Sequence, residues 1–259
     1  PPGPASMATA TIGGNSAQNS GGRRCLKDGV TIDYLLGLEV VLASGKIIQV
    51  GSKNVKDVTG YKMTSLFCGS EGTLGIVTQA ILRVRPKPET VRTVMVTFND
   101  LDNTALAVTD IIGSGILPAA MELMDQLTLN AIEDAAHLGL DRSAQGSLLI
   151  EVDGIKEACE KEMSQIIEKV KANGAVHIQE ATSEEDRENL WVARRSAYGV
   201  FAKMAPDIMS EDVTVPVSRV PDMIRKIVEI TDKYKLKVGV LAHAGDGNIH
   251  VNIMYDKND

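Results

Sequence analysis

The sequence has few aromatic residues, no surplus of positive charge and no long apolar run, and each shortage excludes a class of protein. Aromatic residues make up only 3% of the 259 residues, so Leu, Ile, Val, Met and Ala must fill the core. With 27 Lys and Arg against 34 Asp and Glu, the formal net charge of -7 argues against non-specific nucleic-acid binding, which requires a basic surface. No apolar run approaches the ~20 residues that span a bilayer, and no secretory signal is visible at the start.

Cysteine is also scarce. The three cysteines, Cys25, Cys68 and Cys159, are odd in number, widely spaced and free of any Cys-x-x-Cys pattern. This argues against a disulfide framework and against a thiolate metal site. We therefore expect small buried thiols and a protein of the reducing cytoplasm.

The composition that remains is that of a globular protein with one large or two medium domains. Hydrophobic residues make up 44% of the chain and charged residues 24%. Pro86 and Pro88, on either side of Lys87, mark the best domain boundary, which predicts domains at residues 1–88 and 89–259. In the first domain the pattern predicts strands at 34–42, 46–50 and 76–84, the first two joined by a turn at Ser44 and Gly45.

The second domain alternates short strands with amphipathic helices. Strands are predicted at 91–98, 147–152 and 175–178, an extended segment at 207–217, and helices at 102–113, 125–138, 155–173, 184–204 and 219–234. Because no parallel-sheet runs stand out, we expect an α+β fold, with an antiparallel sheet and helices packed on one of its faces.

The most informative motif is the segment from His243 to His250, which lies between two strand-like apolar runs. If residues 245–248 form the loop of a hairpin, His243 faces His250, with Cβ atoms roughly 5 Å apart on one face. Asn252 points to the same face. Two converging imidazoles are typical of a site for a divalent metal, although a third ligand, such as a carboxylate, is then required. The alternative is a histidine pair that only packs.

Two glycine-rich segments, residues 11–22 and 69–78, are candidates for contact with a cofactor. Glycine lets backbone N–H groups approach an anion closely, and asparagine can pair with the edge of a heterocycle. The spacing matches neither a Rossmann turn nor a Walker loop. The alternatives are a flexible surface loop for the first segment and a structural strand entry for the second.

Arg194 and Tyr198 are four residues apart on the predicted 184–204 helix and therefore share a face. An arginine fork that meets a carboxylate in two places is the usual means of holding an acid substrate. The alternative is a solvated Arg194 that pairs with Glu185 or Glu188. Similarly, Glu211 and Asp212 are candidate ligands or exposed turn residues.

Taken together, several ordered segments resemble the FAD-linked 2-hydroxy acid oxidoreductases of the glycolate oxidase FAD-binding subunit and D-lactate dehydrogenase type. The most distinctive segment runs from Lys56 to Tyr61 and on to Gly69–Thr78. The others are residues 1–6, 11–22, 36–42, 211–216 and 243–250. The resemblance implies the C-terminal part of a vanillyl-alcohol-oxidase-type (PCMH-type) FAD-binding domain, followed by a ferredoxin-like FAD-linked oxidase C-terminal domain that holds the substrate.

The resemblance also implies roles for particular residues. His243 and His250 would hold a divalent metal (Zn, Mn or Fe), and Arg194 would clamp the substrate carboxylate, with Tyr198 and Asn252 as further catalytic candidates. The FAD would be lined by Ser6, Gly13, Gly14, Asn15, Ala17, Asn19, Gly22, Gly72, Ile76 and Val77.

By the same resemblance, a full member would oxidise a small D-2-hydroxy acid, of the glycolate or D-lactate class, to the 2-oxo acid by hydride transfer to flavin. A first pyrophosphate-binding loop is expected upstream of Pro1. A Ser-x-Glu-His-Gly segment, with a third metal ligand and the base, is expected past Asp259. Iron–sulfur or electron-transfer flavoprotein subunits and a homodimer are partners that the family allows. The alternatives are a truncated or non-catalytic subunit without FAD, and a metal-dependent hydrolase that would leave the glycine-rich segments unexplained.

Overall fold

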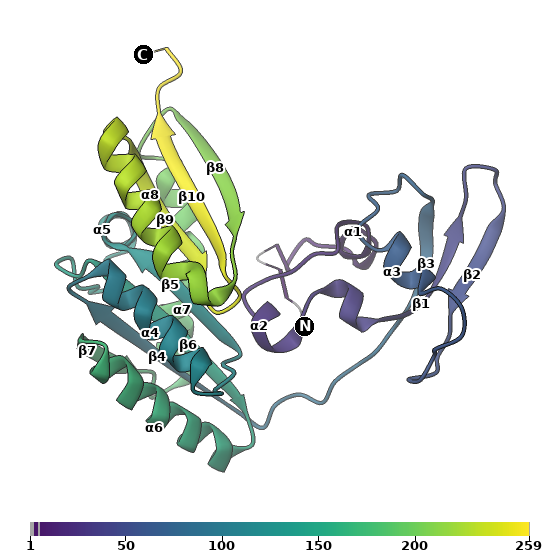
Figure 1. Ribbon diagram of the computed structural model, residues 1–259, viewed down its shortest axis with the longest axis horizontal. Coiled ribbons are helices and arrows are strands. Elements are labelled where there is room, and N and C mark those ends of the chain that lie inside the picture. The colour runs from purple at the N-terminus through teal and green to yellow at the C-terminus, as the bar shows by residue number, and fades with distance from the viewer. Residues whose placement is uncertain (1–2, 5, 259) are drawn as a thin grey trace. The chain divides into compact units, whose positions relative to one another are not determined.

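A computed structural model describes residues 3–4 and 6–258 of the chain. The chain divides into two compact units, residues 1–87 (unit 1) and 88–259 (unit 2), so the division falls between Lys87 and Pro88. Figure 1 labels the helices and strands of both units.

Unit 1 contains a small antiparallel sheet in the order β2-β1-β3. The turn predicted at Ser44 and Gly45 is confirmed, since Val41 pairs with Ile47 and the N–H of Gly45 donates to the carbonyl of Leu42. The core is small and consists of Leu35, Leu38, Val40, Phe67 and Cys68. The elements are α1 (Ile12–Gln18), α2 (Cys25–Asp28), η1 (Thr31–Tyr34), β1 (Leu35–Val41), β2 (Ile47–Gly51), α3 (Met63–Phe67) and β3 (Ile76–Leu82).

Unit 2 is built on a seven-stranded antiparallel sheet in the order β7-β4-β6-β5-β9-β10-β8. Its strands are β4 (Thr90–Phe98), β5 (Ala120–Asp125), β6 (Gly146–Gly154), β7 (Ala175–Glu180), β8 (Asp207–Thr214), β9 (Lys237–His243) and β10 (Asn248–Tyr255). Its helices are α4 (Leu101–Gly113), α5 (Gln126–Ala136), α6 (Lys156–Ala172), α7 (Glu184–Phe201), η2 (Val217–Arg219) and α8 (Val220–Tyr234). The expected α+β class is confirmed.

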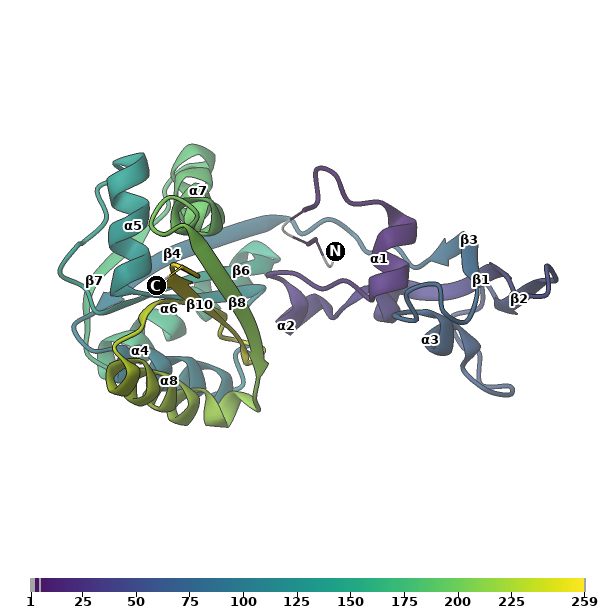
Figure 2. The same ribbon diagram turned by 90° about the horizontal axis from the view of Figure 1, so that it is seen from above.

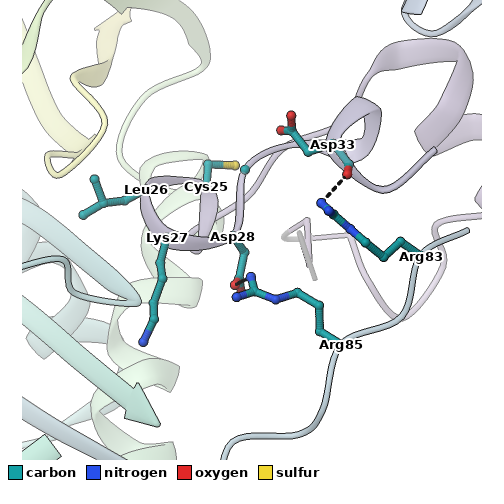
Figure 3. Close-up of a pocket in the computed structure, with 8 residues that line it drawn as sticks. Cys25, Leu26, Lys27, Asp28, Asp33, Arg83 and Arg85 are labelled. Atoms are coloured by element: carbon teal, nitrogen blue, oxygen red, sulfur yellow. Dashed lines mark hydrogen bonds and ion pairs between the residues drawn. The ribbon is translucent and has the colours of Figure 1, made fainter. Parts of the chain in front are cut away.

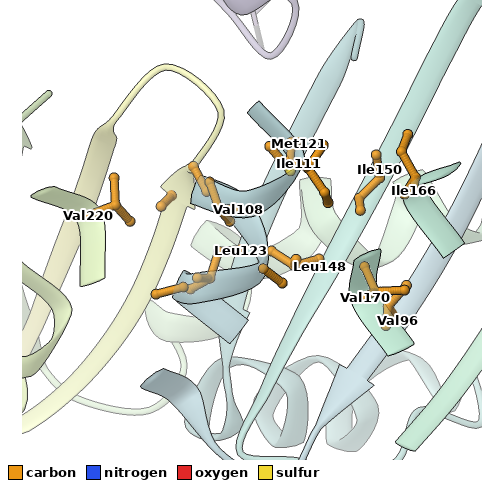
Figure 4. Close-up of a cluster of buried hydrophobic side chains, with 14 of the residues drawn as sticks. Val96, Val108, Ile111, Met121, Leu123, Leu148, Ile150, Ile166, Val170 and Val220 are labelled. Atoms are coloured by element: carbon orange, nitrogen blue, oxygen red, sulfur yellow. The ribbon is translucent and has the colours of Figure 1, made fainter. Parts of the chain in front are cut away.

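The expectation that helices cover one face of the sheet is wrong, because they cover both. Helices α4, α6 and α8 pack on one face and enclose a core that includes Val108, Leu148 and Ile166 (Figure 4). Helices α5 and α7 pack on the other face around Leu149, Trp191 and Phe201 (Figure 2). Strands β4, β5 and β6 are therefore buried on both sides and do not show the polar alternation of a half-exposed sheet.

Strand β5 was not predicted at all, although it lies in the middle of the sheet. All six of its residues are buried. Its apolar run is short and has no alternation, which makes a strand indistinguishable from a buried loop or helix end in the sequence. This omission matters because β5 carries a residue of the site described below.

Cys68 and Cys159 are buried thiols, whereas Cys25 is half-buried, and among the described residues none of the three forms a disulfide. Among the described residues, no helix is both long enough and apolar enough to cross a membrane.

Candidate active site

The β9–β10 hairpin carries the histidine pair, but its register differs from the prediction. The turn consists of residues 244–247 rather than 245–248, and His243 pairs with Asn248, not with His250. Gly247 accounts for the turn: its φ is +81°, and a Cβ there would lie 2.0 Å from the carbonyl oxygen of Val215. Any other residue would collide with the backbone that follows β8.

The two imidazoles still meet, because a shift of two residues keeps both side chains on the same face of the sheet. The ring centroids of His243 and His250 are 5.2 Å apart and the rings are nearly perpendicular, at 83°. The ring of Tyr198, on α7, lies 5.9 Å from that of His250 in an edge-on arrangement. Histidines and tyrosine therefore gather between the sheet and α7.

Each imidazole is held through Nδ1 by a carboxylate on the neighbouring strand. Glu122 of β5 pairs with His243, and Nδ1 of His243 lies 2.7 and 3.0 Å from its two carboxylate oxygens. Asp212 of β8 pairs with His250 and accepts from its Nδ1, while its neighbour Glu211 points to the opposite face. In the described part of the chain, Nε2 of both rings makes no hydrogen bond, which is the arrangement that metal-ligating histidines adopt.

Glu122 also binds Arg194 and so joins the sheet to α7. The Nε of Arg194 donates to Glu122 at 2.8 Å, and the two side chains are 8% and 1% exposed. The alternative of a solvated arginine paired with Glu185 or Glu188 is wrong, since Glu188 binds Arg195 instead. No described residue accepts a hydrogen bond from the terminal nitrogens of Arg194. The N–H groups of these nitrogens are therefore available to bind a ligand.

Charge and burial compete at each titratable group of this cluster. Burial alone would raise the pKa of Glu122, but Arg194 and His243 outweigh it and hold the pKa below its usual range. Burial lowers the pKa of His243, and the charge and hydrogen bond of Glu122 reverse this to a net increase. For His250, burial prevails over Asp212 and the pKa is lowered. Burial also raises the pKa of Tyr198.

Two asparagines on the same face differ in how they are bound. Asn252 is fully buried, and its amide accepts from Ser210 at 2.7 Å and donates to the carbonyl of Gly239 at 3.1 Å. Asn248 lies directly opposite His243, and its side-chain oxygen is buried without a partner among the described residues. A buried oxygen without a partner, on the residue that pairs with His243, fits a site that receives a cation or a donor group.

The sequence reasoning missed Glu122 and Asn248. A signal for Glu122 was present: it is a single charge within the otherwise apolar run from Ala119 to Met124, and buried charges are almost always paired. Asn248 was read as part of the loop. Among the described residues, no group of three or more His, Cys, Asp or Glu side chains is arranged to hold a metal ion, so the two imidazoles would form part of a ligand set.

In unit 1, residues 12–18 of the first glycine-rich segment form helix α1, so the interpretation as a loop is wrong for these residues. The two glycine-rich segments are joined by backbone hydrogen bonds, from Gly69 to Ser16 at 2.9 Å and from Glu71 to Ala17 at 3.0 Å. Gly75 is structural at the entry to β3, since a Cβ there would lie 2.6 Å from a methyl group of Val40. The prediction of a structural strand entry is confirmed at this position.

Apart from Ser6, the positions expected to line FAD lie within these two glycine-rich segments. A Cβ at Gly13 would meet open space, and Ile76 is exposed. Asn19 closes α1 in the left-handed conformation and accepts from the N–H of Ile32. The others lie in the turn at Ser6, in α1 at Gly14, Asn15 and Ala17, and at Gly22, Gly72 and Val77. A backbone-rich, glycine-lined surface of this kind fits a flat cofactor with phosphate groups.

A separate cavity of about 590 Å³ lies elsewhere in unit 1 (Figure 3). Its lining is charged: Arg85 pairs with Asp28 at 2.6 Å, and Arg83 donates to the backbone oxygen of Asp33. None of the expected FAD residues lines it.

Family models match both units. The FAD-linked oxidase C-terminal domain matches residues 87–259, and the FAD binding domain matches residues 1–51. The chain belongs to the FAD-linked oxidases. The expected fold class and family resemblance are thereby confirmed.

Curated FAD-linked oxidases extend the match over nearly the whole chain. Glycolate oxidase subunit GlcD of Bacillus subtilis (strain 168) is 50% identical over 250 residues, which cover 96% of this chain and 53% of that protein. D-lactate dehydrogenase of Archaeoglobus fulgidus is 32% identical, over 93% of this chain and 53% of that protein. The chain thus spans about half the length of the curated relatives it matches.

Solved structures show the same fold at low identity. Alkyldihydroxyacetonephosphate synthase superimposes with a TM-score of 0.74 at 18% identity, over 96% of this chain and 52% of that one. For p-cresol methylhydroxylase the TM-score is 0.71 at 15% identity, over 98% of this chain and 57% of that one.

Proposed function

We propose that this FAD-linked oxidase chain carries the substrate site of an enzyme that oxidises a small D-2-hydroxy acid, of the glycolate or D-lactate class, to the 2-oxo acid. The observation that carries the proposal is Arg194: a buried guanidinium, held by Glu122 through Nε, with its terminal N–H groups unpaired among the described residues. A carboxylate is the ligand that such a fork binds best. The names of the relatives, glycolate oxidase and D-lactate dehydrogenase, support the same substrate class.

The reaction removes two hydrogens from the substrate: a proton from the hydroxyl group, which a general base must take up, and a hydride from the α-carbon. FAD, when bound, supplies the hydride acceptor, and a divalent ion on His243 and His250 supplies positive charge at the hydroxyl oxygen. Arg194 would fix the carboxylate and thereby the orientation of the α-carbon. The free Nε2 atoms would face the ion, with Tyr198 beside His250. Asn252, through Ser210 and Gly239, would keep β8 and β9 in place beside the site.

FAD would lie against the junction of the two glycine-rich segments in unit 1. The match to the FAD binding domain and the surface around Gly13 and Ile76 support this assignment. Several relatives are named as subunits of glycolate oxidase, which supports a multi-subunit assembly. We propose iron–sulfur or electron-transfer flavoprotein subunits as the partners.

The role of Arg194 can be tested with a matched pair of arginines. Arg194→Lys keeps the charge beside Glu122 but removes the fork, while Arg195→Lys changes an exposed neighbour that binds Glu188. Loss of hydrogen bonds to a charged group costs about 1.5–3 kcal/mol, so KM for glycolate or D-lactate should rise roughly 10- to 100-fold in Arg194→Lys. The KM of Arg195→Lys and the FAD content of both variants should not change. An unaltered KM in Arg194→Lys would remove this residue from the site.

A flavin titration separates this proposal from a flavin-free subunit. If the chain binds FAD, the visible absorption of the flavin should remain with the protein after gel filtration. Protein that elutes without flavin absorption after incubation with excess FAD would favour the non-catalytic alternative.

A further inference from the structure

We infer that Glu122 is a positioning residue: it fixes the orientation of His243, a proposed metal ligand, and of Arg194, the proposed ligand of the substrate carboxylate. The inference deepens the proposed function and rests on it. One carboxylate reaches both His243 on the neighbouring strand and Arg194 on the covering helix, at 2.7 and 2.8 Å. Among the described residues, no other side chain bonds to both His243 and Arg194.

The first task of Glu122 is to select one tautomer of His243. A carboxylate at Nδ1 requires the proton there, which leaves the lone pair of the neutral ring on Nε2. It also fixes the rotation of the ring, because both carboxylate oxygens lie within 3.0 Å of Nδ1. His243 is thus prepared as a ligand before any ion arrives.

The second task is to hold Arg194 when no substrate is present. A buried guanidinium without a counter-charge would be costly, and Glu122 supplies that charge through Nε alone. The terminal nitrogens are left to form the two-pronged contact with a substrate carboxylate. The arginine then needs little reordering when substrate binds, which is the basis of tight binding to prepared sites.

Asp212 provides a natural comparison. It holds His250 through Nδ1 in the same way, but its side chain is 68% exposed and makes no bond to Arg194. Water can replace an exposed acceptor, whereas nothing can replace a buried one. The positioning role therefore falls on Glu122, and Asp212 serves as its matched control.

The test compares Glu122→Gln with Asp212→Asn by ¹⁵N NMR of the imidazoles in the metal-free chain, at a pH where the rings are neutral. The wild type and Asp212→Asn should show His243 with its proton on Nδ1, and Glu122→Gln should show a mixture of tautomers. The signals of His137 and His177 report whether the fold is kept. If Glu122→Gln does not fold, Glu122→Asp, which keeps the charge on a shorter side chain, should retain the Nδ1 tautomer only in part.

A second readout is the affinity for Zn²⁺ by calorimetry, which should fall roughly 10- to 100-fold in Glu122→Gln, as for other carboxylates behind metal-bound histidines. An unchanged tautomer and unchanged Zn²⁺ affinity in a folded Glu122→Gln would overturn the inference. The NMR readout needs neither metal nor substrate. If the wild type shows the Nδ1 tautomer but binds neither Zn²⁺ nor a hydroxy acid, the proposed function is wrong. The positioning of His243 by Glu122 would still be supported.

Discussion

Two carboxylate–histidine pairs lie side by side on one face of the unit 2 sheet, and they differ mainly in their exposure to water. Glu122 and His243 are 1% and 22% exposed as side chains, whereas Asp212 and His250 are 68% and 12% exposed. The buried carboxylate has a second partner in Arg194, and the exposed one has none among the described hydrogen bonds and ion pairs. A carboxylate that accepts from Nδ1 of a histidine can therefore have two different roles. When it is buried it fixes its partners, and when it is exposed water can replace it.

The largest expected effect concerns stability. Glu122→Ala leaves Arg194 buried without its charge partner, which should cost about 3–5 kcal/mol in the free energy of unfolding. Asp212→Ala removes an exposed carboxylate that water can replace, and should cost less than ~1 kcal/mol. Urea unfolding followed by fluorescence measures both, because the single tryptophan, Trp191, is buried in unit 2. Equal losses in the two variants would mean that burial of Glu122 adds nothing to its contribution to stability.

A third carboxylate, Asp125, is buried with no cationic partner among the described ion pairs. It caps α5 by accepting from the N–H of Thr128 and also accepts from the N–H of Val240, both at 2.9 Å. Burial therefore prevails and raises its pKa from 3.8 to about 6, the opposite of Glu122, whose pKa is lowered. Neutral donors do not compensate a buried charge as a guanidinium does.

The sign of the resulting pH dependence follows from this shift. The stability that Asp125 contributes is fully present below pH 3.8 and is lost as the pH rises through about 6. Wild type should therefore lose stability relative to Asp125→Asn between pH 4 and 7, by roughly 3 kcal/mol for about two pKa units at ~1.36 kcal/mol each. Denaturation of both proteins across this range provides the check. A difference that does not vary with pH would mean that folding does not raise the pKa of Asp125.

The sequence allowed the hairpin with the two histidines and the shared face of Arg194 and Tyr198 to be predicted, because local periodicity determines both. It did not allow the register to be predicted, since the turn depends on how Gly247 meets Val215, thirty-two residues earlier in the chain. The single charge of Glu122 in an apolar run indicates a buried, paired carboxylate, but the sequence does not show which residues pair with it. Its importance comes from pairing with β9 and from contact with α7, which are both long-range events.

That helices cover both faces of the sheet could not be predicted either, for a related reason. A strand buried on both faces, such as β5 or β6, has no polar alternation to show which helix lies on which side. In unit 1, the segment from Ile12 to Gln18 has two glycines near its start, which favours a loop in isolation. Its hydrogen bonds to the second glycine-rich segment support the helix instead.

We propose that His243 and His250 form part of a divalent metal site beside Arg194, since neither Nε2 has a hydrogen-bond partner among the described residues. Calorimetric titration of the chain with Zn²⁺ tests it most directly, with His243→Ala, His250→Ala and, as a control, replacement of the exposed His177 by alanine. We predict one bound Zn²⁺ for the wild type and for His177→Ala. For each of the other two variants, the affinity for Zn²⁺ should be at least tenfold weaker, which corresponds to a loss of roughly 1.4 kcal/mol in binding free energy. Equal binding by all four proteins would remove both histidines from the metal site.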